Sequence, residues 1–208
     1  HRQKKKDAPA NKINRLLKHS DGNVYAFCNR SVFKCSMNQT VETVFPDIAI
    51  PSPTYSVAQA PDKDIYIGTE SNGLYIYSEN WKLKKHVPID GIIATILPDN
   101  NGDIWLGLDE TGICLFNKNK QTFTWLHKDN TNLNNNSIRT FVPYGDSSIL
   151  VGTFRGLNIL NKKELTITPA NINIAGKGGL SHYSIHSMLI DKDQTLWIRT
   201  YSAGVNYP

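Results

Sequence analysis

Ile-Leu-Pro-Asp-Asn-Asn-Gly-Asp-Ile-Trp-Leu-Gly-Leu-Asp-Glu-Thr-Gly-Ile-Cys-Leu-Phe, residues 96–116, reads as three short strands separated by two turns. Asn101-Gly102 lies between apolar runs, and Asn-Gly supplies the positive φ angles that a tight antiparallel hairpin needs. Residues 104–106 are too few for a helix and favour strands, and a second polar turn bracketed by glycines precedes residues 113–116. The stretch therefore predicts a three-stranded antiparallel meander.

This pattern recurs four more times along the chain. Its equivalent residues are 41, 39, 45 and 47 residues apart, at Tyr25, Tyr66, Trp105, Leu150 and Trp197. A period of about 40 to 50 residues built from strands is that of a propeller blade, whereas helical solenoids show an apolar rhythm of 3.6 residues. A meander of this size cannot bury its own apolar faces, so each unit is expected to stack on its neighbours.

The prediction is an all-β fold, a β-propeller of about five four-stranded antiparallel blades. The blades are expected at about residues 13–53, 54–90, 91–133, 134–180 and 181–208, the last one incomplete, after a linker or disordered segment at residues 1–12. Seven blades of this period would need about 300 residues. We therefore favour part of a larger propeller over a small five-bladed ring.

Composition limits the classes of function. The chain has 208 residues, of which 39% are hydrophobic and 20% charged, as in globular proteins. The longest apolar runs are far shorter than the roughly 18 residues of a membrane span, so no membrane contact is expected from this segment. The net charge is +5, but four of the basic residues lie within residues 1–6. The remainder lacks the basic excess of a nucleic-acid-binding protein.

The three cysteines are expected to be free thiols. If Cys28 and Cys35 lie on two strands of one hairpin that turns at Arg30-Ser31, they are offset by about three residues. This places them about 10 Å apart, beyond the Cα separation of about 7 Å that a disulfide allows.

Three motifs carry a resemblance to a known family. They are Leu-Asn-Asn-Asn-Ser-Ile-Arg at 133–139, the pattern Asp-x-x-Gly-x-Ile-Trp-x-Gly at 99–107, and Gly-Val-Asn-Tyr-Pro at 204–208. Together they resemble the two-component regulator propeller repeat, which builds the periplasmic sensor region of hybrid two-component systems in Bacteroidetes. The resemblance covers about residues 13–208.

The resemblance implies a function and a location. It implies a ligand-sensing propeller in the periplasmic part of an inner-membrane protein, recognising a carbohydrate and relaying to a histidine kinase elsewhere in the chain. The partners it implies are an oligosaccharide or a neighbouring sensor domain, and a homodimer of the full-length receptor. No cofactor is expected. Two departures from the repeat stand out, because Phe27 and Arg199 occupy positions that are glycine in the second, third and fourth repeats.

Several recurring residues are better explained by structure than by chemistry. The aromatic residues Tyr25, Tyr66, Trp105 and Trp197 share one place in the repeat, which indicates packing between blades rather than a sugar-stacking ladder. The aspartates Asp62, Asp99 and Asp191 are expected to cap turns, since the calcium-loop pattern at Asp99 has its glycine too early and lacks its final Glu. His182 and His186 have the spacing of a zinc-binding helix but lie in a strand pattern, so no metal site is expected.

No catalytic residues are expected, and the fragment is not predicted to be an enzyme. Asp109-Glu110 is a pair of carboxylates, but adjacent residues on a turn point apart.

Candidate binding residues lie in the loops at one end of the predicted ring, where connections vary while blades stay fixed. These loops contain Tyr55, Glu70, Asn72, Asp109, Glu110, Asn135, Phe154, Arg155, His182, Tyr183 and Tyr201. The ligand-binding prediction comprises Arg155, Phe154, Tyr201, Tyr183, Asn135 and Arg199. Arg155 is singled out because a guanidinium beside an aromatic ring suits a carboxylate or sulfate on a glycan.

Three hypotheses of function remain open. The preferred one is a non-enzymatic extracytoplasmic sensor module. The others are a propeller polysaccharide lyase or hydrolase, which predicts convergent catalytic groups in the central mouth, and a protein-interaction scaffold, which predicts a protein partner. Fold alone does not choose among them.

Overall fold

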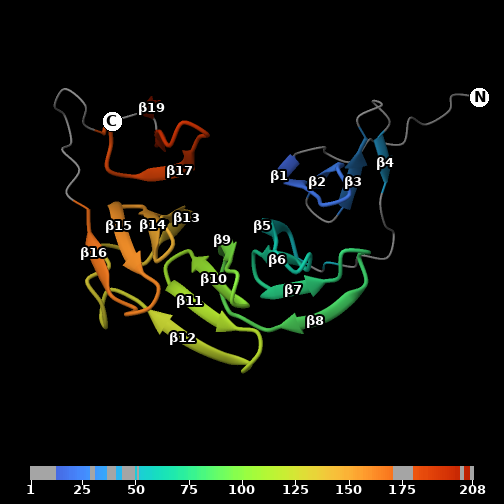
Figure 1. Cartoon of the computed structure of the whole chain (residues 1–208), viewed down its shortest axis with the longest axis horizontal. Coiled ribbons are helices and arrows are strands. Elements are labelled where there is room, and N and C mark those ends of the chain that lie inside the picture. Colours follow the sequence, from blue (N-terminus) through green and yellow to red (C-terminus); the bar gives the residue numbers. More distant parts are fainter. Residues whose placement is uncertain are drawn as a thin grey trace, which may run out of the picture.

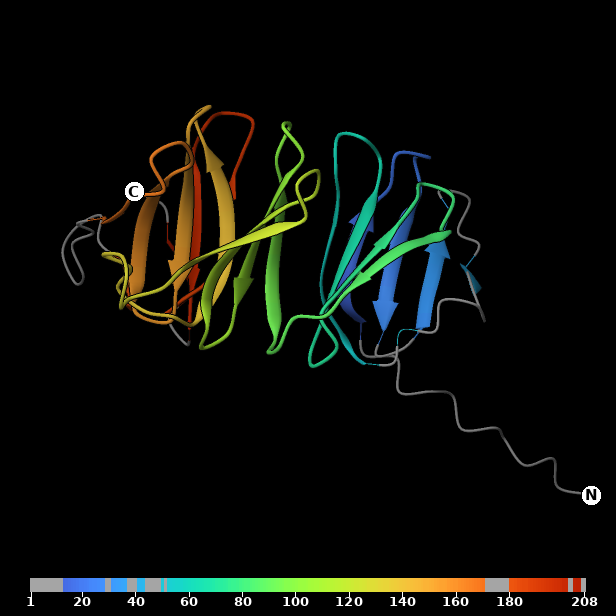
Figure 2. The same cartoon turned by 90° about the horizontal axis from the view of Figure 1, so that it is seen from below.

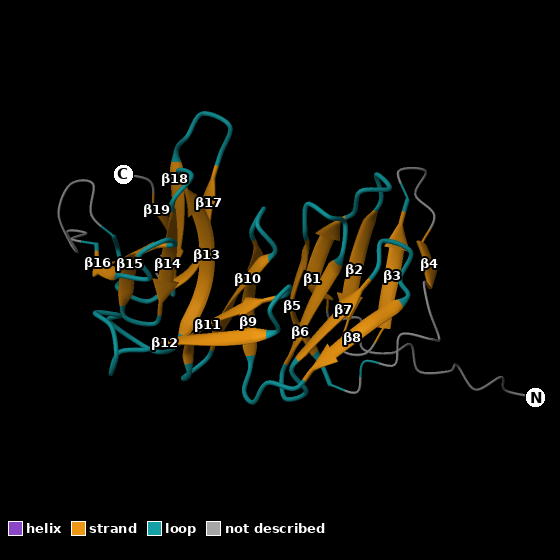
Figure 3. Ribbon diagram, turned by 60° about the horizontal axis from the view of Figure 1, so that its bottom comes forward, coloured by secondary structure: helices purple, strands orange, loops and turns teal. Residues whose placement is uncertain are grey.

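The computed structural model of the protein describes residues 13–28, 31–36, 41–43, 50, 52–170, 180–201 and 204–206. Within these ranges the regular structure consists of β-strands joined by turns and loops (Figure 3). No helix in them has the length and apolar character needed to cross a membrane. The predicted linker at residues 1–12 lies outside the described residues.

Nineteen strands form five antiparallel sheets, in which strand order follows chain order. We number these sheets blade one to blade five. Blade one contains β1 (Ile13–Lys18), β2 (Val24–Cys28), β3 (Ser31–Cys35) and β4 (Val41–Thr43). Blade two contains β5 (Thr54–Gln59), β6 (Ile65–Thr69), β7 (Leu74–Tyr77) and β8 (Leu83–Val87). Blade three contains β9 (Ile93–Pro98), β10 (Asp103–Leu108), β11 (Gly112–Asn117) and β12 (Thr122–Leu126). Blade four contains β13 (Ile138–Tyr144), β14 (Ser148–Thr153), β15 (Gly156–Asn161) and β16 (Ile167–Pro169). Blade five contains β17 (Ile185–Ile190), β18 (Leu196–Thr200) and β19 (Val205–Asn206).

The five sheets lie in a ring around a common axis, with the first strand of each blade innermost (Figure 1). Successive inner strands are neighbours, from β1 to β5, β9, β13 and β17. Seen from the side, the sheets stand next to one another (Figure 2). The predicted all-β propeller of about five blades is confirmed.

The hairpin that decided the prediction is present, with one difference. The amide of Asp99 donates to the carbonyl of Asp103 at 2.7 Å, which closes the turn between β9 and β10. Of the Asn101-Gly102 pair, only Gly102 adopts a positive φ, of 87°. The turn therefore resembles a three-residue loop that ends on a left-handed glycine, rather than a two-residue turn that needs two positive φ angles.

Apolar clusters lie between successive blades and join them. In the cluster between blades three and four, Trp105 is grouped with Phe141, Ile149 and Leu160, and it is 1% exposed. Tyr25 and Tyr66 occupy equivalent places in the clusters that join blade one to two and blade two to three. The predicted packing role of these three aromatic residues is confirmed. Trp197 differs, because it is 36% exposed.

Glycine in the second strand permits this close contact between blades. A Cβ atom on Gly107 would lie 2.5 Å from Cγ2 of Ile138, which belongs to the inner strand of the next blade. Gly152 has the same relation to Ile185, at 2.7 Å. Arg199 stands at this position in blade five. A blade that packed on blade five as the others pack would collide with its side chain.

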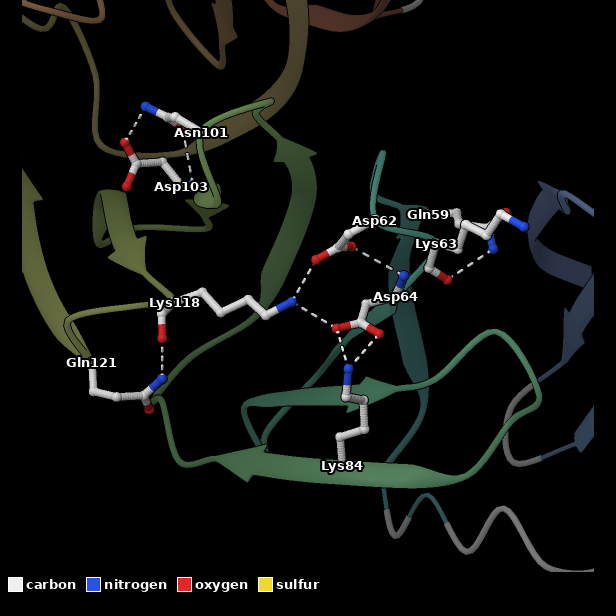
Figure 4. A network of polar contacts seen from close by, with 9 residues as sticks. All are labelled: Gln59, Asp62, Lys63, Asp64, Lys84, Asn101, Asp103, Lys118 and Gln121. Carbon is white, nitrogen blue, oxygen red and sulfur yellow. Dashed lines mark hydrogen bonds and ion pairs between the residues drawn. The ribbon is translucent and has the colours of Figure 1, made fainter.

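Polar contacts between turns connect neighbouring blades. The ammonium group of Lys118 in blade three contacts Asp62 at 2.5 Å and Asp64 at 2.7 Å in blade two, and Lys84 also contacts Asp64 at 2.7 Å (Figure 4). Burial alone would raise the pKa of Asp62. Hydrogen bonds from Lys118 and from the Asp64 amide, together with nearby lysine charges, outweigh burial and lower this pKa.

The turn aspartates cap their own turns, as predicted. Oδ1 of Asp62 accepts the amide of Asp64 at 3.1 Å, and Oδ1 of Asp191 accepts the amide of Thr195 at 2.9 Å. Oδ1 of Asp99 accepts the amide of Asn100 at 2.8 Å. These carboxylates satisfy backbone donors, so the structural interpretation accounts for them.

The cysteines are free, as predicted. In the hairpin of β2 and β3, Cys28 pairs with Ser31 and Cys35 pairs with Val24, so the two thiols lie near opposite ends of the strands. Cys114 is buried in blade three, and burial raises its pKa to about 12.

Candidate ligand-binding site

A cavity of about 710 Å³ opens at one end of the propeller axis. Its lining comes from blades one, two and five, whose inner strands converge there (Figure 1). The lining residues are Ile13, Asn14, Arg15, Pro53, Thr54, Tyr55, Glu70, His186 and Arg199. We call this space the axial cavity.

A bulge at the start of every inner strand shapes the axial cavity. In each strand one residue is skipped by the pairing register with the second strand, and a bulge of this kind redirects a side chain. The skipped residues are Asn14 in β1, Tyr55 in β5, Ala94 in β9, Arg139 in β13 and His186 in β17. Three of these five line the axial cavity.

A repeated backbone hydrogen bond joins the end of the second strand to the start of the inner strand, and we call the donor residues the rim positions of the propeller. In blades two to five, the first residue after the second strand donates its amide to a carbonyl just before or at the start of the inner strand, at 2.9 to 3.0 Å. The pairs are Glu70 with Pro53, Asp109 with Ile92, Phe154 with Ser137, and Tyr201 with Ser184. Glu70, Asp109, Phe154 and Tyr201 are therefore equivalent rim positions.

Arg139 is fixed between blades three and four. Its Nη1 lies 3.4 Å from Oδ2 of Asp109, and its guanidinium carbon lies 5.9 Å from the centroid of the Phe154 ring. An ion pair and a cation–π contact of this kind each contribute about 0.5–1 kcal/mol at partly exposed sites. Both contacts hold the Arg139 side chain beside the axis.

Positive charge gathers around His186. His186 is exposed, but its partial burial lowers its pKa, and the charges of Arg199, Arg139 and Arg15 lower it further. Among the residues that the structure describes, Arg139 has a carboxylate partner, whereas Arg15 and Arg199 form no ion pair. One donor of Arg15, Nη1, is used by the backbone carbonyl of Asn14 at 2.8 Å.

One of the six predicted ligand-binding residues lines the axial cavity, and two more occupy rim positions equivalent to Glu70, which lines it. Arg199 lines the cavity. Phe154 occupies a rim position, and the guanidinium group of Arg139 lies over its ring. Tyr201 is a rim residue whose side chain is 62% exposed.

The other three do not line the axial cavity. Tyr183 stacks on His182, with ring centroids 4.3 Å apart. Asn135 uses Oδ1 to accept the amide of Ser137 at 2.9 Å, which orders the connection into β13. Arg155 is exposed on the turn between β14 and β15. The six predicted residues thus form no single cluster.

Sequence reasoning missed Arg15 and Arg139, and it considered His186 only for a metal site, which it did not expect. One signal was available. Ser137-Ile138 and Ser184-Ile185 are equivalent, and the residue after each Ile is the one that the bulge turns toward the axis. The bulge itself leaves no mark in the sequence, so the convergence of these side chains could not be read from it.

The described residues gather no group of three or more His, Cys, Asp and Glu side chains that could hold a metal ion. A second cavity, of about 450 Å³, lies on the outer side of blade three beside Phe123 and Trp125. Asp90 is the one charged side chain in its lining. The axial cavity, which brings charged groups together from three blades, is the stronger candidate site.

Residues 179–202 match the family model of the two component regulator propeller. The segment contains Ser184-Ile185, β17 and β18. The resemblance that the sequence motifs predicted is confirmed there. No curated protein sequence matches the chain.

Solved structures share the fold over nearly the whole chain. The extracellular domain of a B. thetaiotaomicron protein described as a hybrid two-component system matches with a TM-score of 0.74 and 23% identity, covering 96% of this chain and 27% of that one. A second extracellular domain of this description, also from B. thetaiotaomicron, matches with a TM-score of 0.74 and 18% identity, over 99% of this chain and 28% of that one. PorZ, a surface component of the type-IX secretion system of Porphyromonas gingivalis, matches with a TM-score of 0.67 and 17% identity, over 94% of this chain and 32% of that one.

This chain therefore spans between a quarter and a third of the length of the structures it resembles. The same fold occurs in extracellular domains of proteins described as hybrid two-component systems and in a secretion-system component. At these identities the likeness shows the fold, and function has to be argued from the site.

Proposed function

We propose that the chain is the ligand-sensing propeller of an extracytoplasmic two-component sensor and that it binds a carbohydrate in the axial cavity. In this proposal the propeller lies in the periplasm as part of a longer inner-membrane protein. The observation that carries the proposal is the axial cavity, in which three blades contribute donors, an acceptor and an aromatic face. The fold shared with extracellular domains of hybrid two-component systems supports it.

The axial cavity has the size and chemistry for a saccharide. Its volume of about 710 Å³ falls within the usual range for small-molecule sites, about 300–1,000 Å³. Tyr55 is 37% exposed and offers a ring face on which a pyranose can stack. The guanidinium groups of Arg15 and Arg199 donate hydrogen bonds, and the carboxylate of Glu70 accepts them. Sugar hydroxyls both donate and accept, so they match this mixed lining.

Binding without turnover fits the same lining. Glycoside hydrolysis requires two carboxylates on either side of the scissile bond, about 5–10 Å apart. Among the residues that line the axial cavity, Glu70 supplies one carboxylate. Asp109, on the rim, is engaged by Arg139.

The relay in this proposal is mechanical. A ligand in the axial cavity contacts blades one, two and five together, so it favours whichever arrangement of these blades binds it better. The resulting shift would pass through the longer chain to a histidine kinase, with the full-length receptor acting as a homodimer or through a neighbouring sensor domain.

Calorimetric titration of the chain with a panel of plant, host and microbial oligosaccharides tests the binding step. We expect saturable binding of at least one oligosaccharide, weakened about tenfold or more by Tyr55→Ala. Tyr144→Ala is the matched control, because Tyr144 is also exposed but lies at the far end of β13. Binding by none of the panel, or hydrolysis of a bound oligosaccharide, would contradict the proposal.

The reading frame downstream of Pro208 tests the relay. A membrane-spanning segment followed by a histidine-kinase domain is expected. A stop codon soon after Pro208 would contradict the relay.

A second candidate function, a protein-interaction scaffold, is favoured by the likeness to PorZ. It predicts calorimetric binding of a partner protein and no response to any oligosaccharide. The titration above therefore separates the two candidates.

A further inference from the structure

We infer that the axial cavity binds the carboxylate or sulfate group of an acidic saccharide, held between Arg15 of blade one and Arg199 of blade five. This inference rests on the proposed carbohydrate-binding function and specifies its substrate class. The two guanidinium groups supply the charge, and the remaining lining contacts the neutral part of the sugar.

Arg15 stands where blades two to five carry small residues, and Arg199 stands where blades two to four do, whereas blade one has Phe27 at that position. Arg15 pairs with the second strand at the place that Ser56, Thr95, Thr140 and Ser187 occupy in blades two to five. Arg199 stands where blades two to four have glycine. Packing between blades explains the small residues and does not explain either arginine. Both departures line one cavity.

These arginines differ from four other cations of the described chain, which contact carboxylates within a blade or between blades. Lys84, Lys118, Lys162 and Arg139 each contact a carboxylate at 2.5 to 3.4 Å. Arg15 and Arg199 have no such partner among the described residues, although both line a partly enclosed space. Like charges in one cavity repel each other, and an anion placed between them removes that repulsion.

Arginine suits this task geometrically. Its planar fork presents five donors and binds carboxylate or sulfate in a bidentate manner, which ammonium groups cannot do. Nη1 of Arg15 donates a hydrogen bond to the Asn14 carbonyl, and this bond also holds the Arg15 side chain in place. The carboxylate of Glu70 in the same cavity disfavours a densely charged ligand. A saccharide with one acidic group and several hydroxyls fits better than a polysulfated chain.

His186 gives the site a dependence on pH. The groups that face it are Arg199 on β18, Arg139 on β13 and Arg15 on β1, and Tyr55 and Glu70 line the same cavity. Partial burial and the three guanidinium charges lower the pKa of His186, so the unliganded site disfavours the protonated imidazole. A bound anion favours the protonated form, and by linkage protonation favours the anion. Affinity for the acidic saccharide therefore rises as pH falls.

The test compares saccharides that differ only in the acidic group. The chain is titrated calorimetrically with an oligosaccharide ending in glucuronic acid, its counterpart ending in glucose, a monosulfated counterpart, and inorganic sulfate. We expect an acidic saccharide to bind about tenfold or more tightly than the neutral one, with the preference decreasing as salt is added. Between about pH 8 and 5.5 its affinity should rise in the wild type and stay flat in His186→Gln.

Variants assign the preference to residues. Arg15→Gln and Arg199→Gln should each remove about tenfold in affinity for the acidic saccharide and weaken neutral binding much less, because glutamine keeps a hydrogen-bond donor and loses only the charge. Arg199→Lys keeps the charge and should recover part of the loss. Lys192→Gln is the control, because Lys192 is an exposed cation in the turn at the opposite end of β17 and β18. Circular dichroism spectra and melting temperatures of the variants establish that each is folded.

The outcomes separate the inference from the proposed function. Equal affinity for acidic and neutral saccharides would overturn the inference and leave carbohydrate binding intact. Binding of no saccharide would overturn both. Inorganic sulfate bound as tightly as the acidic saccharide would indicate a site for a free oxyanion, and loss of acidic binding in Arg155→Gln alone would move the site to the turn after β14. Either result would overturn the inference.

Discussion

Trp105 and Trp197 occupy the same position in blades three and five, yet one is core and the other is surface. Trp105 is 1% exposed and Trp197 is 36% exposed. The residues beside them differ in the same way. Ile113 in blade three is fully buried, whereas Val205, its equivalent in blade five, is 61% exposed. Leu189 in blade five is 62% exposed.

The difference shows what a repeat encodes. Each blade carries one apolar side face, and this face becomes core only when another blade covers it. Blade three has blade four beside it, with Ile138 over Gly107. Blade five has no such neighbour among the described residues, and its indole Nε1 donates to Asp191 at 2.6 Å instead. Equivalence in sequence therefore predicts where a residue lies in its strand. Whether that residue contributes to stability as part of the core depends on whether another blade covers it.

The largest expected difference in the free energy of unfolding is between the variants that remove Trp105 and Trp197. Trp105→Ala should lower the free energy of unfolding by about 3–5 kcal/mol, because it empties a closely packed site between two blades. Trp197→Ala should lower it by about 1 kcal/mol, because water already reaches that ring. Urea unfolding followed by circular dichroism measures both. Equal losses would contradict the difference between the two faces.

Adding one methyl group should also separate the two faces. Gly107→Ala places a Cβ atom 2.5 Å from Ile138 and 2.6 Å from Thr95, and should lower the free energy of unfolding by about 1–3 kcal/mol. Arg199→Ala, at the equivalent position of blade five, should change it by less than about 0.5 kcal/mol. Thermal melts of the two variants provide the measurement. A stable Gly107→Ala protein would show that blades three and four are not tightly packed there.

The ion pairs between turns should contribute less than the apolar faces. Lys118→Met leaves Asp62 and Asp64 without one partner and should lower the free energy of unfolding by about 1 kcal/mol at pH 7. Lys120→Met is the control, because Lys120 is exposed and forms no ion pair among the described residues.

The contribution of Lys118 should disappear in acid. Asp62 has a lowered pKa in the folded chain, so its contribution is complete above its unfolded pKa of about 4 and is lost as pH falls through the folded value. Urea titrations of wild type and Lys118→Met between pH 7 and about pH 3 should therefore converge. A difference that stays constant with pH would mean that Lys118 stabilises the blades by packing and not by charge.

The smallest effect is expected on the exposed face of blade five. Val205→Thr should change the free energy of unfolding by less than about 0.5 kcal/mol, since the side chain already contacts water. A loss above about 1 kcal/mol in urea would show that this face is covered in solution.

Most of the fold could be predicted from the period of the repeat. The repeat unit was defined by Trp105, the turn before it and Gly107. Strand propensity and turn chemistry then predicted its strands, their order and the face that packs on the next blade. What the period could not supply was the exposure of Trp197, because burial there depends on a neighbouring blade and not on local sequence.

The site was only partly predictable. Arg199 was recognised because it broke a glycine position, and the structure places it in the axial cavity. Arg155 was chosen because Phe154 is its neighbour in sequence, but the cation over Phe154 is Arg139, which arrives from the inner strand. Adjacent residues on a turn point apart, and only the fold brings distant ones together. The bulge at Arg139 and His186 completes this arrangement.

Fluorine NMR of the chain labelled with 5-fluorotryptophan compares the two blade faces in one sample, because it reports the solvent exposure of each indole. Trp→Phe variants assign the resonances, and exchange of water for D₂O shifts only those rings that contact solvent. We expect no solvent isotope shift for Trp105 and a clear shift for Trp197. Equal shifts for the two indoles would contradict the claim that blades become core only where another blade covers them.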